Sequence, residues 1–208
     1  MAADLGKWGN GPHYGPVLSQ TELYLLRPEL ELHPILTGSD GSFHLVMSLQ
    51  TGVLGGFNAS AAASDSEFVK KDEPATIPRV EQLYIISDLT PWCTTVRNES
   101  GVTLENICRT LFQQYTQEYV TEAEIAALSP RVHDHIQRTA AHRVNNQTYN
   151  APPTWGGYTP ASPVPNRFQR VDWLRDRMFF EGVRKDPDYT RGRLGFDAPN
   201  IFVMTLTS

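Results

Sequence analysis

The sequence predicts a single α+β domain, and the order of its periodic segments carries that prediction. Apolar and β-branched runs at 80–87, 92–97 and 201–206 are typical of strands, whereas helical spacing of apolar residues is confined to 103–144. Strands therefore precede and follow the helices, unlike the strand–helix alternation of a parallel doubly wound sheet. We expect residues 32–208 to form one domain, an antiparallel sheet with two or three helices packed on one face and long loops rich in proline and glycine.

An N-terminal arm, residues 1–31, carries one short helix. Ser19 and Glu22 have the spacing of a capping box, in which each side chain accepts a hydrogen bond from a backbone N–H at the start of a helix. We therefore expect a helix at Gln20–Leu26, which connects the arm to the domain.

The first strand is predicted at 43–49, where apolar side chains alternate with His44 and its even-numbered neighbours. His44 should therefore face away from the apolar side of the sheet. Residues 51–74 are rich in Gly, Ala and Ser and end in the charged run 70–73, a composition that buries little apolar surface. We expect this segment to be a mobile insertion loop.

A hairpin and a long helix follow. The β-rich runs 80–87 and 92–97 are separated by a turn-like connection and should pair as antiparallel strands. Apolar residues then recur at helical spacing over 104–119, behind Thr103, whose hydroxyl is suited to an N-cap.

The remaining segments predict two more helices, a short turn and two strands. Capping patterns predict two further helices, near 122–128 and 130–144. Residues 170–174 are expected as a short turn of helix or strand, and 178–183 and 201–206 as two strands joined by a loop.

A second mobile insertion is expected at 145–167, because five prolines and two glycines leave no regular element there. Its aromatic side chains could form a lid or a docking surface, and a mobile linker is the alternative. The candidate ligand-binding aromatics are Tyr149, Trp155, Tyr158 and Trp173.

Composition excludes several classes of function. The formal net charge is −5 without a basic block, which argues against a nucleic-acid partner. No run of 18 apolar residues is present, so no membrane partner is expected, and the N-terminus lacks the apolar segment of a secretory signal. Cys93 and Cys108 are too few for a disulfide framework. We expect a cytoplasmic protein, and the absence of nucleotide, flavin and zinc motifs predicts no cofactor and no metal.

His133 and His135 suggest a metal site at first sight, because only Asp134 separates them. Residues two apart on a helix point about 200° away from one another, so the pair cannot close one site. His135 instead shares a helix face with three other basic residues, namely Arg131, Arg138 and His142. This face is either a solvated surface or a stripe that binds an anion or a partner. Convergence of the four side chains on a concavity would favour the stripe.

Five short strings stand in a fixed order along the chain. They are Leu32-His33-Pro34-Ile35-Leu36, Pro74-Ala75-Thr76-Ile77-Pro78, Pro91-Trp92, Val102-Thr103-Leu104-Glu105-Asn106-Ile107 and Arg170-Val171-Asp172-Trp173-Leu174. Together they resemble a domain family of unknown function that is abundant in mushroom-forming fungi. The resemblance spans about residues 32–206 and implies a small α+β domain of intracellular character, without a reaction. Members often carry an aromatic-Asp pair on the strand after the His-Pro string, where this chain has 44–48, so no role of that carboxylate is carried over.

Three scattered polar residues are candidates for acid–base chemistry. His33 and His44 could lie near each other across a turn, and Asp88 lies in the connection of the predicted hairpin. The structural alternatives are a histidine that hydrogen-bonds a carbonyl at the sheet edge and an aspartate that accepts turn N–H groups.

Arg170 and Asp172 form the polar pair of greatest interest. On an extended segment they share one face and can pair, while Trp173 enters the core. The pair is either a structural anchor for the return from the long loop or an acid–base or carboxylate-binding group.

The favoured hypothesis is a non-enzymatic binding module for a small apolar ligand or a protein segment, because the polar residues are scattered over several elements. The alternative is a cofactor-free isomerase, cyclase or hydrolase acting on a small organic metabolite, with His44, Asp172 and Arg170 as base, orienting group and anion clamp. A structural domain that forms homo-oligomers through its sheet edges is a third possibility.

Overall fold

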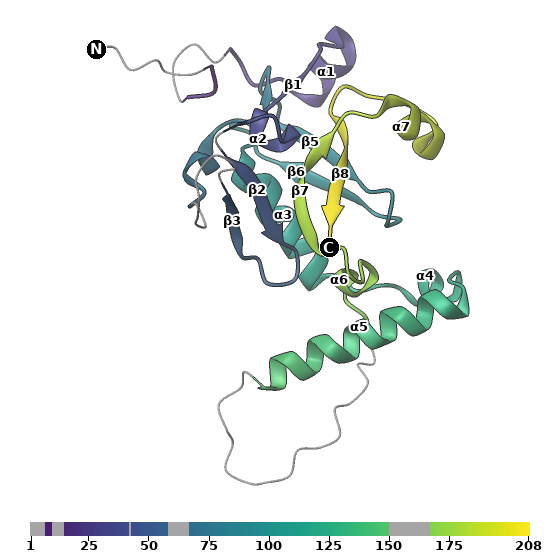
Figure 1. Ribbon diagram of the computed structural model, residues 1–208. Helices are drawn as coiled ribbons and strands as arrows, with labels where there is room; N and C mark the ends of the chain where they lie inside the picture. Colours follow the sequence, from purple (N-terminus) through teal and green to yellow (C-terminus); the bar gives the residue numbers. More distant parts are fainter. Residues whose placement is uncertain (1–6, 10–14, 42, 58–66, 150–166) are drawn as a thin grey trace.

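A computed structural model describes residues 7–9, 15–41, 43–57, 67–149 and 167–208 (Figure 1), with side chains in the fourth range as far as Asn145. The strands are β1 (Glu31–Leu32), β2 (His44–Ser48), β3 (Leu54–Phe57), β4 (Thr76–Ile77), β5 (Gln82–Ile86), β6 (Cys93–Arg97), β7 (Phe179–Arg184) and β8 (Ile201–Thr207). The helices are α1 (Gln20–Leu26), α2 (Pro34–Thr37), α3 (Leu104–Gln117), α4 (Glu122–Ala126), α5 (Pro130–Tyr149), α6 (Arg170–Trp173) and α7 (Pro187–Leu194), with a 3-10 turn η1 (Val69–Asp72).

Six strands form one sheet in the order β3-β2-β7-β8-β5-β6, and β1 pairs with β4 in a separate ribbon. All neighbours in the large sheet are antiparallel except β5 and β8, which run parallel. The last strand of the chain therefore lies in the middle of the sheet, between the β2–β3 hairpin with β7 on one side and the β5–β6 hairpin on the other. The predicted α+β class is confirmed, as is the antiparallel pairing of β5 with β6.

The two faces of the sheet bury different amounts of apolar surface. The larger core lies between the sheet and the helices α2 and α3, and its sheet residues alternate along each strand. They include Leu45, Met47, Leu83, Ile85, Val96, Phe180, Phe202 and Met204. On the opposite face Ile86, Ile201 and Val203 form a smaller cluster against Tyr189 and Leu194 of α7. Helices thus cover both faces of the sheet, whereas the sequence predicted helices on one face only. The difference is α7, which packs on the face that was expected to have no helix.

Local signals place several elements at the predicted residues. The capping box of Ser19 and Glu22 starts α1, and Thr103 caps α3 in a second box with Asn106. Burial alternates along β2, so that His44 faces away from the larger core as expected.

Three predictions about loops are wrong for the residues that the structure describes. The range 51–74 contains β3, which pairs with β2, and η1. α5 continues to Tyr149, five residues into the range 145–167. The connection before β8 contains α7, whose start is signalled by Asp186 as N-cap and a proline at the first helical position, a pattern visible in the sequence. The remaining residues of the two predicted insertions, 58–66 and 150–166, lie outside the described part of the chain.

Gly182 of β7 lies against the backbone of α2, and its replacement tests this packing. A Cβ atom at Gly182 would lie 2.1 Å from the Leu36 carbonyl oxygen, a contact that only backbone movement can relieve. We expect Gly182→Ala to lower the free energy of unfolding by about 2 kcal/mol or more, measured by urea denaturation. Gly192→Ala in α7 is the control, because nothing lies within 4 Å of its added Cβ, and it should not destabilise the protein. Equal stability of the two variants would contradict the packing described.

Candidate functional site

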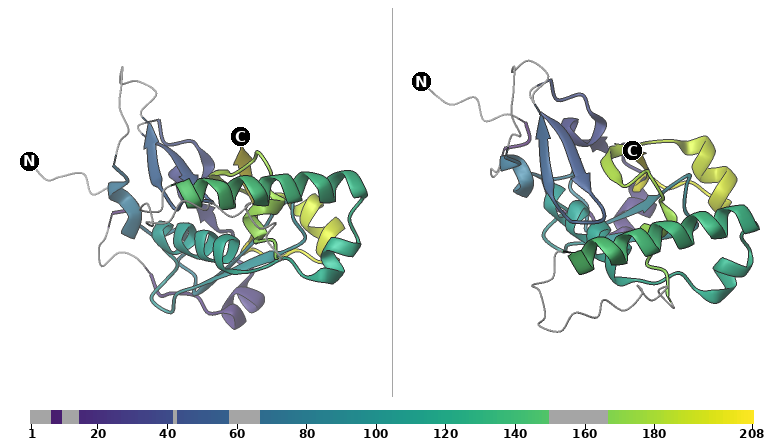
Figure 2. Two further views of the ribbon diagram at one scale, coloured as in Figure 1. Left: turned by 90° about the horizontal axis from the view of Figure 1, so that it is seen from below. Right: turned by 60° about the horizontal axis from the view of Figure 1, so that its bottom comes forward.

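The long helix α5 crosses one end of the domain, below the sheet in Figure 1 and seen from below in Figure 2. Its contact with the domain is a narrow stripe, because Ile136, Ala140 and Arg143 are buried at intervals of three and four residues. Two of these side chains are apolar and one carries a charge, so the charged residue needs a partner in the interior.

Asp172 of α6 is that partner. The Arg143 guanidinium donates two hydrogen bonds to the Asp172 carboxylate, from Nε at 2.8 Å and from Nη2 at 2.9 Å. Both side chains are almost completely buried, with exposed fractions of 8% and 1%. The carboxylate also accepts a hydrogen bond from the Gln169 backbone N–H, so it starts α6 and holds α5 at the same time.

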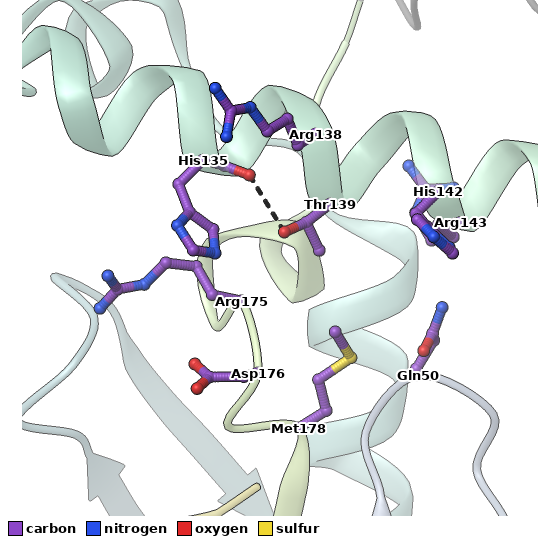
Figure 3. Close-up of a pocket in the computed structure, with 9 residues that line it drawn as sticks. All are labelled: Gln50, His135, Arg138, Thr139, His142, Arg143, Arg175, Asp176 and Met178. Carbon is purple, nitrogen blue, oxygen red and sulfur yellow. Dashed lines mark hydrogen bonds between the residues drawn. The ribbon is translucent and has the colours of Figure 1, made fainter.

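A concavity of about 310 Å³ lies beside this ion pair, between α5 and the segment that follows α6. Figure 3 shows His135 and Thr139 projecting from α5 toward Arg175 and Asp176, with Met178 below them. The complete lining consists of Gln50, His135, Arg138, Thr139, His142, Arg143, Arg175, Asp176 and Met178. Three of the four residues of the predicted basic stripe therefore line one concavity, and Arg131 is the exception.

The concavity is positively charged although the chain as a whole is acidic. Arg143 is neutralised by Asp172, whereas the guanidinium groups of Arg138 and Arg175 form no hydrogen bond or ion pair with any described residue. Asp176 offsets one of these two charges, and two histidines add positive charge when they are protonated. Free guanidinium groups at a concave surface are suited to bind carboxylate or phosphate.

Arg175 has a left-handed backbone conformation, with φ of 61°. This conformation costs a residue with a side chain about 1 kcal/mol relative to glycine. Arg27, after α1, has a similar backbone, so the conformation alone does not identify a site. At Arg175 it places a long cationic side chain between α5 and the turn at Asp176 (Figure 3).

A larger concavity, of about 430 Å³, lies between the N-terminal arm and Pro78. Its charged groups are already engaged. Lys7 forms an ion pair with Glu31, and Arg79 donates hydrogen bonds to the carbonyls of Ser100 and Gly15. It therefore offers no free charge that would select a ligand.

His33 has a structural role at the start of α2. Its Nδ1 accepts a hydrogen bond from the Ile35 N–H at 3.1 Å, and its Nε2 donates to Glu73 at 2.8 Å. Trp8 packs edge-on against the ring. Burial lowers the pKa of His33, and the hydrogen bond to Glu73 partly offsets that effect.

The other two scattered candidates lie on different elements, His44 on β2 and Asp88 between β5 and β6. His44 lies half-exposed on β2, with its Nε2 3.9 Å from Glu181 of β7 and its ring against Phe57. Asp88 is exposed between β5 and β6. In the turn there, the Ser87 hydroxyl accepts a hydrogen bond from the Leu89 N–H at 3.0 Å. Ser87 therefore has the role in the turn that was predicted for the Asp88 carboxylate.

The predicted pairing of Arg170 with Asp172 is wrong. The segment is helix α6 rather than an extended strand, and residues two apart on a helix point away from each other. Arg170 forms an ion pair with Glu118 and lies over the Trp92 ring, 4.6 Å from its centre. Asp172 pairs with Arg143, a partner 29 residues earlier in the chain.

Of the four candidate ligand-binding aromatics, Trp173 is the one whose side chain belongs to the described part of the structure. Trp173 is half-buried, packs against Trp92 at 5.2 Å and donates a hydrogen bond to the Leu89 carbonyl. Tyr149 is the last residue of α5, and its side chain lies outside the described residues, as do Trp155 and Tyr158.

The five strings that carry the family resemblance meet in two places. His33 donates its backbone N–H to Ala75, and Ala75 donates its own to Val102, each at 2.9 Å, so the first, second and fourth strings form one hydrogen-bonded unit. The third and fifth strings are in contact through the rings of Trp92 and Trp173. These strings build the scaffold, and none of their residues lines the basic concavity.

The fold and the site together define an α+β domain with a basic concavity at one end. The chain belongs to a family of unknown function, DUF6699, whose model matches residues 55–192. No curated protein and no solved structure matches the chain. The expected membership of a family without an assigned reaction is thus confirmed.

The described part of the chain lacks two features, a membrane-spanning helix and a cluster of metal ligands. No helix in it has the length and apolar character needed to cross a membrane. In the same residues, no three His, Cys, Asp or Glu side chains gather in a way that could hold a metal ion. His133 and His135 are indeed separated, because His133 packs edge-on against Phe168.

Only part of this site is predictable from the sequence. The spacing of His135, Arg138 and His142 was visible as a helix stripe, whereas Gln50 and Arg175 reach the concavity from distant segments. No local pattern marks these two residues, because their role depends on how the segments pack.

The buried pair can be tested by removing one charge or both. Arg143→Met leaves the Asp172 carboxylate buried without its partner, and we expect it to lower the free energy of unfolding by about 3–5 kcal/mol in urea denaturation. The double variant Arg143→Met/Asp172→Leu removes both charges and should recover most of that loss, apart from the cap on α6. A double variant as unstable as the single one would contradict this account.

His33 should make stability depend on pH. A histidine pKa that is lowered on folding means that the unfolded chain binds the proton more tightly. Its contribution is therefore complete above the ordinary pKa of about 6.5 and is lost as pH falls below that value. We expect the free energy of unfolding to fall between about pH 7 and pH 5, and to fall less in His33→Asn, which keeps an acceptor for the Ile35 N–H. Parallel pH profiles for the two proteins would refute this role.

Proposed function

We propose that this protein is a non-enzymatic binding module whose ligand, a protein segment or a small molecule, carries an anionic group. The observation that supports the proposal is the pair of guanidinium groups of Arg138 and Arg175, which line one concavity and form no hydrogen bond or ion pair with any described residue. Because carboxylates and phosphates accept charge-assisted hydrogen bonds from arginine, they are the ligand groups of choice. This chemistry replaces the apolar ligand expected from the sequence.

The alternative, acid–base catalysis on a small metabolite, has no supporting geometry. Asp172 is occupied by Arg143, and Arg170 by Glu118 and Trp92. His44 lies on the sheet beside Glu181, and it does not line the basic concavity. A general base must reach its substrate together with the groups that orient it, and each of these three residues is engaged with a different partner.

A cytoplasmic location and a fungal origin belong to the same proposal. Both rest on the resemblance of the five strings, which implies a fungal domain of intracellular character. Imaging of a fluorescently tagged copy would test the location.

The proposal is tested by adding anions and removing single arginines. We expect inorganic phosphate, citrate or a hexaglutamate peptide to raise the thermal midpoint of the unaltered protein beyond chloride at equal ionic strength. Arg138→Gln and Arg175→Gly should each weaken the affinity about tenfold in isothermal titration calorimetry, through the loss of charge-assisted hydrogen bonds. Arg175→Gly should at the same time raise the free energy of unfolding by up to about 1 kcal/mol, because glycine relieves the left-handed backbone.

Arg131→Gln is the matched control, since Arg131 is exposed on the same helix outside the concavity. It should keep the affinity of the unaltered protein. The proposal fails if none of the three anions acts beyond chloride, or if Arg131→Gln loses as much affinity as Arg138→Gln.

A further inference from the structure

The strand β6 forms one edge of the large sheet, and its outward backbone groups can be assigned. Tyr84 of β5 donates its N–H to Asn200 beside β8, so even-numbered residues of β5 bond toward β8 and odd-numbered ones toward β6. Their partners on β6, Thr94 and Val96, therefore bond inward. The backbone N–H and C=O groups of Cys93, Thr95 and Arg97 therefore point out of the sheet.

No described segment pairs with these outward groups, because β6 is last in the strand order. An unpaired edge is common in sheets and does not by itself indicate a ligand. At β6, however, the edge borders a second feature, a groove of about 390 Å³.

Helix α3 forms the other wall of this groove with a stripe of polar side chains. Thr110, Gln113, Gln114 and Gln117 follow the spacing i, i+3, i+4 and i+7, which places them on one helix face. Cys93 and Thr95 line the groove from the strand. Gln114 accepts a hydrogen bond from the Thr94 hydroxyl and ties the helix to the strand. The groove therefore runs along the edge, between backbone groups on one side and amide and hydroxyl groups together with the Glu118 carboxylate on the other.

The dimensions and chemistry of the groove fit an extended polypeptide. From Thr110 to Gln117 the helix rises about 10 Å, the length of about three residues of a β-strand. Glutamine amides both donate and accept hydrogen bonds, as a peptide backbone requires. A strand added here would pair with the outward groups of β6 and place alternate side chains over α3.

We propose that the edge of β6 binds an extended segment of a partner protein, which adds a seventh strand to the sheet in the groove beside α3. This site is separate from the basic concavity and does not depend on the anionic ligand proposed there.

The opposite edge, β3, is the weaker candidate. It presents the exposed apolar side chain of Phe57 and two glycines, with exposed Val53 directly before it, and none of the described concavities lies along it. The groove at β6 is polar, so its affinity must come from backbone pairing and its specificity from side chains over α3.

The test uses twelve-residue random peptides displayed on phage and selected on the unaltered protein. We expect selected peptides to bind with micromolar affinity, typical of small added strands with polar contacts. Thr95→Pro removes one outward N–H without touching the ladder to β5, so it should fold normally by thermal denaturation and weaken binding at least tenfold. Thr95→Val is the matched control, because it keeps the backbone donor and should bind as the unaltered protein does.

A second measurement needs no variant and covers the case in which Thr95→Pro fails to fold. Amide hydrogen exchange of the unaltered protein should show that a bound peptide protects Thr95, whose N–H points outward. Thr94, already bonded to β5, should change little.

Several results would overturn the proposal. One is the failure of the library to yield any binder, and another is a peptide that leaves Thr95 exchange unchanged or loses its affinity in Thr95→Val. The third is self-association of the unaltered protein, seen by size-exclusion chromatography and abolished in Thr95→Pro, because the occupant of the edge would then be a second copy of the chain. Competition by inorganic phosphate would place the peptide in the basic concavity and would also count against the edge.

Discussion

The ion pair between Arg143 and Asp172 is the interaction on which the arrangement of this end of the domain depends. Desolvation of two charges offsets most of their attraction, so the pair adds little stability compared with apolar residues of the same size. Its effect is on geometry. The two parallel hydrogen bonds accept only one orientation of α5 relative to α6, and a slip of one helix turn would leave both charges buried and unpaired.

The orientation of α5 in turn creates the basic concavity. The buried stripe through Ile136 and Arg143 faces the domain, so the neighbouring stripe with His135 and Arg138 must face the segment after α6. One end of that segment is held by Asp172 and the other enters β7. The Arg143–Asp172 ion pair and the basic concavity therefore both depend on α5. A change in the ion pair would move the side chains that line the concavity.

The scaffold and the proposed binding surfaces use different kinds of residue. The five strings that carry the resemblance form backbone hydrogen bonds and aromatic contacts around His33 and Trp92, and all their residues except Pro91 are buried or half-buried. The basic concavity and the edge of β6 are built mainly from exposed or partly exposed polar residues. The contacts among the five strings thus help to explain how the domain folds, whereas the proposed binding surfaces consist of residues that none of these strings includes.

The sequence by itself determined the elements whose signals are local: the capping boxes at Ser19 and Thr103, the alternation along β2, the hairpin of β5 and β6, and the stripe of His135 with Arg138. These depend on neighbours within one helix turn or one strand pair. Only the tertiary structure decided the partner of Asp172, the parallel contact of β5 with β8 and the approach of Arg175 to α5. Each of these joins segments far apart in the chain, and their separation is set by the packing of the whole core rather than by any local pattern.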